Sequence, residues 1–473
     1  MVVVRQLSAY CFGKKNWGTP RKPQALLFSL KVSDFLLPAV VPRLFLKEGL
    51  LGRLAHIEQG IIKVTRGLFA AIPLCIGLVG AFAAPAYATD PAPTDWWSSV
   101  KYDFMVEGGF TGNPDNPPSP PGNFGQLFTD RPNEFLLNQL LFTVHRDVDE
   151  NKAWDTGFKF QFMYGTDARY TRYLGEFDDA GSGNFAPAIQ EAWVDFKTPW
   201  LGKGGTDLKI GQFVTPLGIE VIDPRGNFFY SHSYIFDFGL PFENTGILAV
   251  THVSDKLDLY GGIDTGVNTT FGKPGDPTGT ASFNAGFGLN KLMNGKLTIL
   301  ALTHIGPSDP MHSSELRYLS DAFATYKFTD KLTWSTEFNY AFDSISGGQT
   351  GWGIAEYLTY TYNDWLSFGM RAEYWDDVNN FWVSAFTSPN GFIDFQETAN
   401  PNFVFSAPKA TPYSELTFGM NIKPFSKSKA KWLNTALIRP EVRWDHSYNT
   451  DAFDNFTDNN QVTIASDFVV TFQ

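Results

Sequence analysis

The sequence predicts an all-β fold: a transmembrane antiparallel β-barrel of about sixteen strands, with one long loop folded inward. Three observations after residue 88 lead to this fold class. Apolar and polar residues alternate in stretch after stretch, as in strands that have two different faces. No stretch there approaches the roughly eighteen uninterrupted apolar residues of a membrane helix. The connections between the alternating stretches are by turns short and long.

The alternating stretches define the expected strands in order along the chain. In Trp154–Tyr164, aromatic side chains alternate with Asp155, Lys159 and Gln161, and Leu332–Phe342 repeats this pattern. The full set comprises Lys101–Phe110, Phe135–His145, Trp154–Tyr164, Ala192–Phe196, a strand from Leu208, a strand entered at Thr245, Leu257–Val267, Phe283–Leu289, Leu297–Ile305, Leu316–Phe328, Leu332–Phe342, Trp352–Tyr362, Leu366–Tyr374, Leu416–Ile422, Ile438–Trp444 and Val462–Phe472.

The apolar faces of these strands favour a membrane barrel over a soluble one. They are almost wholly aliphatic or aromatic, whereas a soluble barrel has its apolar side inside. Trp154 and Tyr164 share one face and lie about 25 Å apart along a tilted strand, which matches two interfacial aromatic girdles. Lipid cannot satisfy the edges of a sheet, so the sheet must close. A closed barrel of about sixteen strands leaves an aqueous lumen.

The connections also fit an outer-membrane barrel, which has short periplasmic turns and long external loops. The short ones include Val253–Lys256, Thr329–Lys331 and Tyr362–Asp364, and the long ones 112–133, 165–187, 212–244, 376–411 and 445–460. The loop 212–244 is rich in Phe and Tyr and is broken by three prolines. Burying each aromatic side chain is worth about 2 kcal/mol, so we expect this loop to pack on the inner wall of the barrel.

The N-terminal part divides into an extension over 1–60, a signal peptide over 61–88 and the barrel over 89–473. A basic start, an apolar run over Leu68–Phe82 and the small-residue site Ala86-Tyr87-Ala88 indicate a cleaved secretory signal. Leu74 argues against the rival interpretation, a lipoprotein signal that uses Cys75. A buried helix is the other alternative. Because a signal peptide stands at the N-terminus, we interpret 1–60 as the product of a misassigned translation start.

Charge and cysteine content limit the partners and the chemistry. Residues 1–88 carry eleven basic and three acidic side chains, so the rest of the chain has a net charge of −20, against −12 for the whole. This charge argues against nucleic acid as a partner and favours a weak preference for cations. Both cysteines precede residue 89, so the mature chain has no thiol chemistry.

Catalytic and metal-binding patterns are weak. The six histidines after residue 88 are scattered, and Ser231-His232-Ser233 has no designated acid beside it. The stretch Asp147–Asn151 lacks the glycine and the closing Glu of a calcium loop. We therefore expect no enzymatic activity, no catalytic residue, no metal and no cofactor.

Charged residues on the inward faces of three consecutive strands form the candidate site. They are Arg371, Glu373, Glu415, Arg439, Glu441 and Arg443, and the long loop offers Glu220, Asp223 and Arg225 to face them. One interpretation is a ladder of salt bridges that stiffens the wall. The other is a pore constriction with a transverse field, since rings of charge set selectivity in narrow pores. The two interpretations are compatible.

Several motifs resemble a known family. They are Ile210–Glu220, Asn227–Phe236, Pro241–Ala249, Arg371–Asp377 and Arg439–Asp445, and together they resemble the outer-membrane beta-barrel porin-2 (OmpL-like) family over nearly all of 97–473. Asn244 stands where this family favours His, and Gln473 follows the terminal Phe472. The resemblance implies a porin-type barrel in the outer membrane of a Gram-negative cell.

The sequence thus predicts a passive diffusion channel for small hydrophilic solutes or ions. An outer-membrane barrel enzyme of the lipase or protease type, and a structural or adhesive barrel, are the alternatives. The expected partners are outer-membrane lipid and the solutes themselves, and a homotrimer is one assembly open to such a barrel.

Overall fold

The structure, a computed structural model, describes residues 95–473 apart from 120–121, 174–175, 178–179, 181–183, 271–280, 308–313 and 384–408. The predicted N-terminal extension and signal peptide lie outside the described residues. Among the helices of the described part, none is both long and apolar enough to span a membrane.

Sixteen strands are found within the described residues, and they follow the predicted alternation. Their bounds are β1 Lys101–Gly112, β2 Phe135–Arg146, β3 Asp155–Gly165, β4 Ala186–Thr198, β5 Gly205–Val214, β6 Glu243–Ser254, β7 Leu257–Asp264, β8 Ser282–Lys291, β9 Leu297–Pro307, β10 Leu316–Lys327, β11 Leu332–Asp343, β12 Gln349–Asn363, β13 Leu366–Asp377, β14 Thr411–Ile422, β15 Leu437–Ser447 and β16 Asn460–Phe472.

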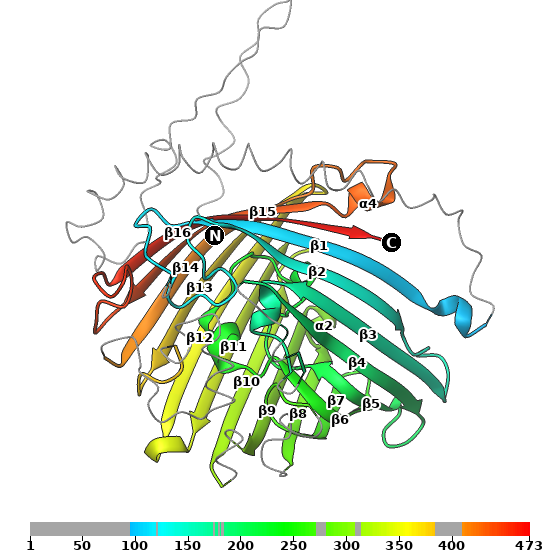
Figure 1. The fold of residues 1–473 in the computed structure, drawn as a ribbon. Helices are drawn as coiled ribbons and strands as arrows, with labels where there is room; N and C mark the ends of the chain where they lie inside the picture. Colours follow the sequence, from blue (N-terminus) through cyan, green and yellow to red (C-terminus); the bar gives the residue numbers. More distant parts are fainter. Residues whose placement is uncertain are drawn as a thin grey trace, which may run out of the picture. The chain divides into compact units, whose positions relative to one another are not determined.

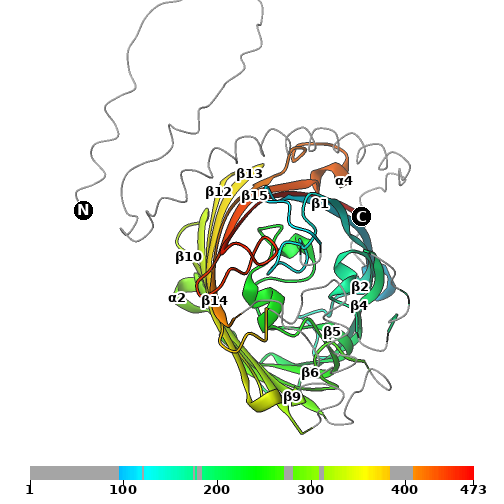
Figure 2. The same cartoon turned by 60° about the vertical axis from the view of Figure 1, so that its left-hand side comes forward.

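Each strand pairs antiparallel with its neighbours in sequence, and β1 pairs with β16, so the sheet closes into a barrel (Figures 1 and 2). At the closure Phe104 lies opposite Phe472, and their ring centroids are 6.3 Å apart. Closure gives every strand edge a hydrogen-bonding partner, as a sheet in lipid requires. The predicted antiparallel barrel of about sixteen strands is confirmed.

The two faces of the barrel wall differ sharply. On β13, Phe368 is 41% exposed whereas Arg371, on the alternate face, is 0% exposed. The same holds on β15, where Val442 is 46% exposed and Arg443 is 1% exposed. The exposed face of the barrel is therefore apolar and the inner face polar. This is the arrangement of a barrel that is surrounded by lipid and not by water.

Several strands extend beyond the stretches that the alternation marks. β4 begins at Ala186 and not at Ala192, and a bulge opposite Gln161 and Phe162 breaks the period there. β14 begins at Thr411, ahead of the expected Leu416. β7, in contrast, is shorter than expected, because it ends at Asp264 and not at Val267. Backbone pairing continues past the apolar band, where alternation is no longer required, so sequence patterns miss these ends.

The longest connections, such as 113–134, 215–242 and 378–410, follow odd-numbered strands, and the tightest turns, 255–256 and 364–365, follow even-numbered ones, so they lie at opposite ends of the barrel. The lengths overlap, because the connection 344–348 after β11 is short and the connection 423–436 after β14 is longer. A short helical turn, η2 Trp97–Ser99, precedes β1, and the connections hold six more: η3 Asp167–Arg169, η4 Pro224–Gly226, η5 Ile235–Gly239, α2 Leu292–Gly295, η6 Ile345–Gly347 and α4 Lys431–Asn434. We call the end with the turns 255–256 and 364–365 the short-turn end. The core lies inside the barrel, where connecting segments pack on the wall.

Candidate functional site

The segment 215–242, between β5 and β6, is the center of the candidate site. Apart from η4 and the single π-turn η5 it has no regular structure, yet its aromatic side chains are buried: Phe229, Tyr230, Tyr234, Phe236 and Phe238 are at most 5% exposed. Figure 2 shows this green segment within the ring of strands. The ring of Tyr234 stacks on that of Tyr413 of β14, with centroids 5.2 Å apart.

Glycines in the wall admit the aromatic rings of this segment. A Cβ added to Gly369 of β13 would come within 2.3 Å of the ring of Phe228, and one added to Gly109 of β1 within 2.4 Å of the ring of Tyr230. Atoms this close would overlap, so only glycine allows the backbone of the wall and these rings to approach each other.

Carboxylates of the wall accept hydrogen bonds from the backbone of the segment. Glu441 of β15 accepts from the N–H groups of Tyr230 and Ser231 at 2.9 and 3.0 Å. Glu373 of β13 accepts from the N–H groups of Tyr234 and Ile235 at 2.6 and 2.8 Å. Buried backbone donors that no helix or sheet satisfies need such partners.

Arginines of the wall donate to carbonyl groups of the same segment. Arg439 donates to the carbonyl oxygens of Pro224, Asn227 and Phe229 at 2.8, 3.1 and 3.0 Å. Arg371 donates to the carbonyl of Ser231 at 2.8 Å, and Arg443 donates to that of His232. One face of the wall thus supplies donors and acceptors for an irregular chain.

Each arginine is also neutralised within the wall or by the segment. Arg371 contacts Glu415 at 3.0 Å and Glu220 at 2.6 Å. Arg439 pairs with Asp467 at 2.5 Å and with Glu107 at 2.9 Å, and Arg443 pairs with Asp445 at 2.8 Å. A buried charge without a partner is strongly destabilising, and these ion pairs offset that cost for each arginine.

The three predicted loop residues lie in two different environments. Glu220 is buried and accepts from the N–H of Ser233 at 2.9 Å, with the ring of His232 at 3.2 Å. Burial by itself would raise the pKa of Glu220, but Arg371, together with His232 and Ser233, lowers that pKa to about 2.

Asp223 and Arg225 lie toward the solvent. Their side chains are 27% and 29% exposed and pair at 2.5 Å. Arg225 also contacts Asp103 of β1 at 2.8 Å.

The geometry differs from the expected field across an opening. All six predicted wall residues do lie together on β13, β14 and β15. Five of them bond to the segment directly, and the sixth, Glu415, bonds to Arg371. Glu220 touches Arg371 and does not face it across an aqueous gap. The physical reason is the irregular backbone of the segment, which needs hydrogen-bonding partners, and the wall charges supply several of them.

The motif Ser231-His232-Ser233 is used for packing and hydrogen bonding. The imidazole of His232 stacks on the ring of Phe236, with centroids 4.1 Å apart. Ser231 Oγ accepts from Arg371 at 3.1 Å, and Ser233 Oγ accepts from the N–H of Phe236 at 3.1 Å. Within the described residues, no group of three or more His, Cys, Asp or Glu side chains is arranged to hold a metal ion.

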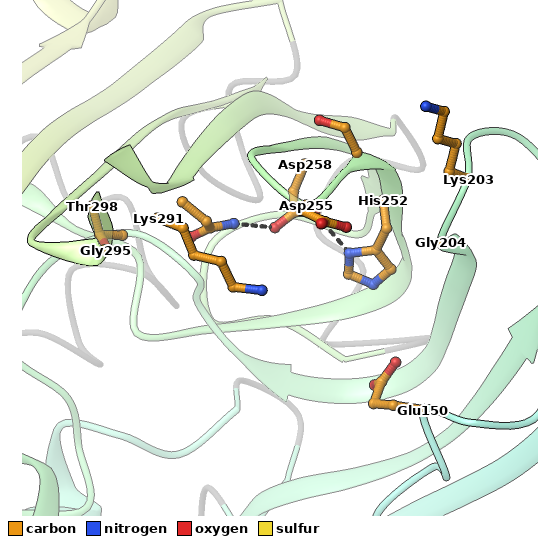
Figure 3. Close-up of a pocket in the computed structure, with 11 residues that line it drawn as sticks. Glu150, Lys203, Gly204, His252, Asp255, Asp258, Lys291, Gly295 and Thr298 are labelled. Atoms are coloured by element: carbon orange, nitrogen blue, oxygen red, sulfur yellow. Dashed lines mark hydrogen bonds and ion pairs between the residues drawn. The ribbon is translucent and has the colours of Figure 1, made fainter. Parts of the chain in front are cut away.

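A second polar cluster lies at the short-turn end, and the sequence reasoning missed it. The imidazole of His252 on β6 stands 2.7 Å from Asp258 and 3.1 Å from Asp207. His252 and Asp258 border a cavity of about 510 Å³ that Lys203 and Lys291 also line (Figure 3). The alternation could have indicated this cluster, because it places Asp207, His252 and Asp258 on the inner face of three adjacent strands.

Comparison with known proteins identifies one matching family and several solved structures with a similar fold. A family model described as beta-barrel porin-2, OmpL-like, matches residues 99–472. A search of curated proteins with this sequence finds no match.

Among solved structures, the chain is similar in fold to the following three. OprB of Pseudomonas putida, at high pH, is 12% identical over 79% of this chain and 94% of that chain, with a TM-score of 0.49. The channel DcaP of Acinetobacter baumannii is 10% identical over 79% and 96%, with a TM-score of 0.45. An anion-selective porin from Comamonas acidovorans is 8% identical over 79% and 99%, with a TM-score of 0.46. Likeness at this level carries no conclusion about solute or selectivity.

Proposed function

The chain belongs to the beta-barrel porin-2, OmpL-like family, and from this premise we propose that it is a passive diffusion channel of the outer membrane for small hydrophilic solutes or ions. The observation that carries the proposal is a closed barrel of sixteen strands with an apolar outer face and a polar inner face. Side chains of the wall cannot fill a barrel of this width, so an aqueous lumen crosses it.

The segment 215–242 narrows this lumen and sets the size of the opening. In this proposal Arg371, Arg439, Arg443, Glu373 and Glu441 belong to the constriction because they hold the segment on one side of the wall. Glu220 of the segment and Glu415 of the wall belong to it through their ion pairs with Arg371. Support comes from their direct bonds to the backbone of the segment, such as those from Glu441 to Tyr230 and Ser231. These residues would control pore size more than they control charge selectivity, because the network covers its own charges.

Selectivity would then depend on charged groups that solvent reaches. Asp223 and Arg225 are such groups on the segment. The negative charge of the mature chain favours a weak preference for cations. Neutralising Asp223 by Asp223→Asn should therefore shift the reversal potential toward anions, whereas Glu441→Gln should change the conductance without a comparable shift.

Reconstitution tests the proposal directly. Purified barrel in planar bilayers should give stepwise ohmic conductance, and proteoliposomes should swell in solutions of small sugars with no energy source. Heat-unfolded protein at the same concentration is the control. Folded barrel that gives neither conductance nor swelling would overturn the proposal in favour of a plugged barrel or a barrel enzyme.

The assembly and the maturation belong to the same proposal. The barrel would reach the outer membrane through a signal peptide that is cleaved after Ala88, and a homotrimer is the assembly that we propose for it. Chemical cross-linking of intact outer membranes, followed by mass measurement, distinguishes a trimer from a monomer.

A further inference from the structure

The turn between β14 and β15 has a composition unlike the rest of the barrel, residues 89–473. Residues 423–436 contain four lysines and no acidic residue, in a protein whose net charge is −12. The lysines are Lys423, Lys427, Lys429 and Lys431, and all four are exposed. Within the part of the chain that the structure describes, none of them has a carboxylate partner in an ion pair. We call these four residues the lysine cluster.

The turn is fastened to the last strand at the lipid-facing side of the barrel. The hydroxyl of Thr435 donates to the carbonyl of Thr471 at 3.0 Å and accepts from the N–H of Thr471 at 2.8 Å. The ring of Trp432 stacks on that of Phe472, with centroids 5.6 Å apart and planes at 21°. Figure 1 shows α4, at the end of this turn, near the C-terminal end of β16.

Aromatic residues mark this position as the level of the lipid headgroups. A continuous row is formed by Trp432, Phe472 and Phe104, since the ring centroids of Phe472 and Phe104 are 6.3 Å apart. Phe425, within the turn, is 43% exposed. Aromatic girdles stand at the two interfaces of outer-membrane barrels, just outside the apolar band. The lysine cluster therefore lies beside the surface where lipid tails end and phosphate groups begin.

We propose that the lysine cluster binds the headgroups of anionic phospholipids in the leaflet at the short-turn end. An ammonium group donates to phosphate oxygens while its methylene chain rests on apolar surface. Clusters of four or more basic residues next to a membrane-spanning element attract anionic lipid, by about fivefold for each lysine at the surface. The aromatic row favours lipid over a soluble polyanion, because a soluble partner would gain nothing from an apolar anchor at the edge of the bilayer.

The test compares two lipids around the full-length mature barrel in nanodiscs. Spin-labelled phosphatidylglycerol and spin-labelled phosphatidylcholine report the fraction of each lipid that the protein immobilises. In the test variant, Lys423, Lys427, Lys429 and Lys431 are all changed to Gln. The matched control changes Lys256, Lys296, Lys327 and Lys331 to Gln, which removes the same charge from exposed positions at the other short turns of the same end.

We expect the wild type to prefer phosphatidylglycerol by at least about fivefold at low salt. The test variant should lose most of this preference, while the control variant should keep it. Changing the four lysines to Arg should also preserve it, and raising the ionic strength should weaken it, because salt screens exposed charges. Heat-modifiable mobility on gels would show that the test variant is folded.

Three results would overturn the proposal. The first is a test variant that retains the full preference for phosphatidylglycerol, and the second is a control variant that loses as much of it as the test variant. The third is wild-type protein with no lipid preference that binds purified peptidoglycan through the same lysines, which would identify the cell wall as the partner. None of these results depends on whether the lumen conducts.

Discussion

The guanidinium of Arg371 on β13 and the carboxylate of Glu220 in the segment 215–242 lie 2.6 Å apart, and both side chains are buried. The pair joins the wall of the barrel to the irregular segment inside it. Removing one partner of a buried ion pair leaves the other charge without compensation, which is strongly unfavourable. Position and stability of the segment therefore depend on this contact.

Substituting Arg371 by Met should loosen the segment. We expect a loss of about 3–5 kcal/mol in the free energy of unfolding, together with larger or noisier single-channel conductance. Denaturant titration and planar-bilayer recording measure the two effects. The matched control is Arg317→Met, which breaks a buried pair with Asp343 at 2.8 Å on the wall. It should destabilise the barrel but leave the conductance unchanged, and equal conductance in both variants would contradict the anchoring role.

Gly369→Ala should displace the ring of Phe228, because the new Cβ would stand 2.3 Å from it. Overpacking of this kind costs about 1–3 kcal/mol, which denaturant titration would detect. Gly261→Ala is the control, since a Cβ there has no neighbour within 4 Å. Adding Phe228→Ala to Gly369→Ala should recover part of the loss. If the double variant is as unstable as the sum of the two single variants, the close contact is not the cause.

The barrel could be predicted from sequence because its cause is local. Alternation along each strand follows from one face in lipid and one face inside, and this constraint repeats sixteen times. The inward positions of Arg371, Glu415 and Arg443 follow from the same parity. The alternation did not predict that Ala186–Gln190 belong to β4, because a bulge opposite Gln161 breaks the period there.

The contacts of the candidate site could not be predicted, because they join residues far apart in sequence. Nothing in the order of residues shows that Glu441 receives the N–H groups of Tyr230 and Ser231. Alternation assigns a side chain to a face but not to a partner. It therefore left open whether the wall charges face an opening or lie under the segment. The cluster around His252 was missed for the same reason, since its three members come from different strands.

Asp237 should make stability depend on pH. Burial raises the pKa of its carboxyl to about 7, although His232 and Arg443 act to lower it. Between about pH 4 and pH 7 the unfolded chain has released this proton while the folded chain retains it, so stability should fall as pH rises through that window. Above pH 7 this contribution should fall no further.

Asp237→Asn should remove this dependence. The free energy of unfolding of Asp237→Asn should exceed that of wild type by an amount that grows from near zero at pH 4 to on the order of 4 kcal/mol above pH 7. Unfolding titrations at several pH values measure it, with Asp364→Asn, at an exposed short turn, as the control. A difference between Asp237→Asn and wild type that stays constant across this pH range would mean that Asp237 is already ionised at pH 4.

Mature protein from outer membranes should begin at Thr89. The basic residues Lys63 and Arg66, the following apolar run and the site Ala86-Tyr87-Ala88 have the order that signal peptidase recognises. N-terminal sequencing and intact mass measure the start. Ala88→Asp should block cleavage and accumulate the longer form, since the site requires small residues. Mature protein that retains residues before Ala88 would refute the signal peptide.

Deleting residues 225–238 should raise the single-channel conductance. The deletion removes the aromatic residues that pack on the wall and most of the carbonyl and N–H groups that Arg439, Glu441 and Glu373 bind. The lumen should then be wider, and liposomes should admit larger sugars than before.

The loss of partners for those charged residues should also lower stability, so the deletion is best combined with a check of heat-modifiable mobility. Replacing the same residues by an equally long Gly/Ser stretch separates the loss of packing from the shortening of the chain. This variant should also conduct more than wild type, because a Gly/Ser chain has no aromatic rings to dock on Gly109 and Gly369. A folded barrel whose conductance is unchanged by both variants would show that the segment does not narrow the path.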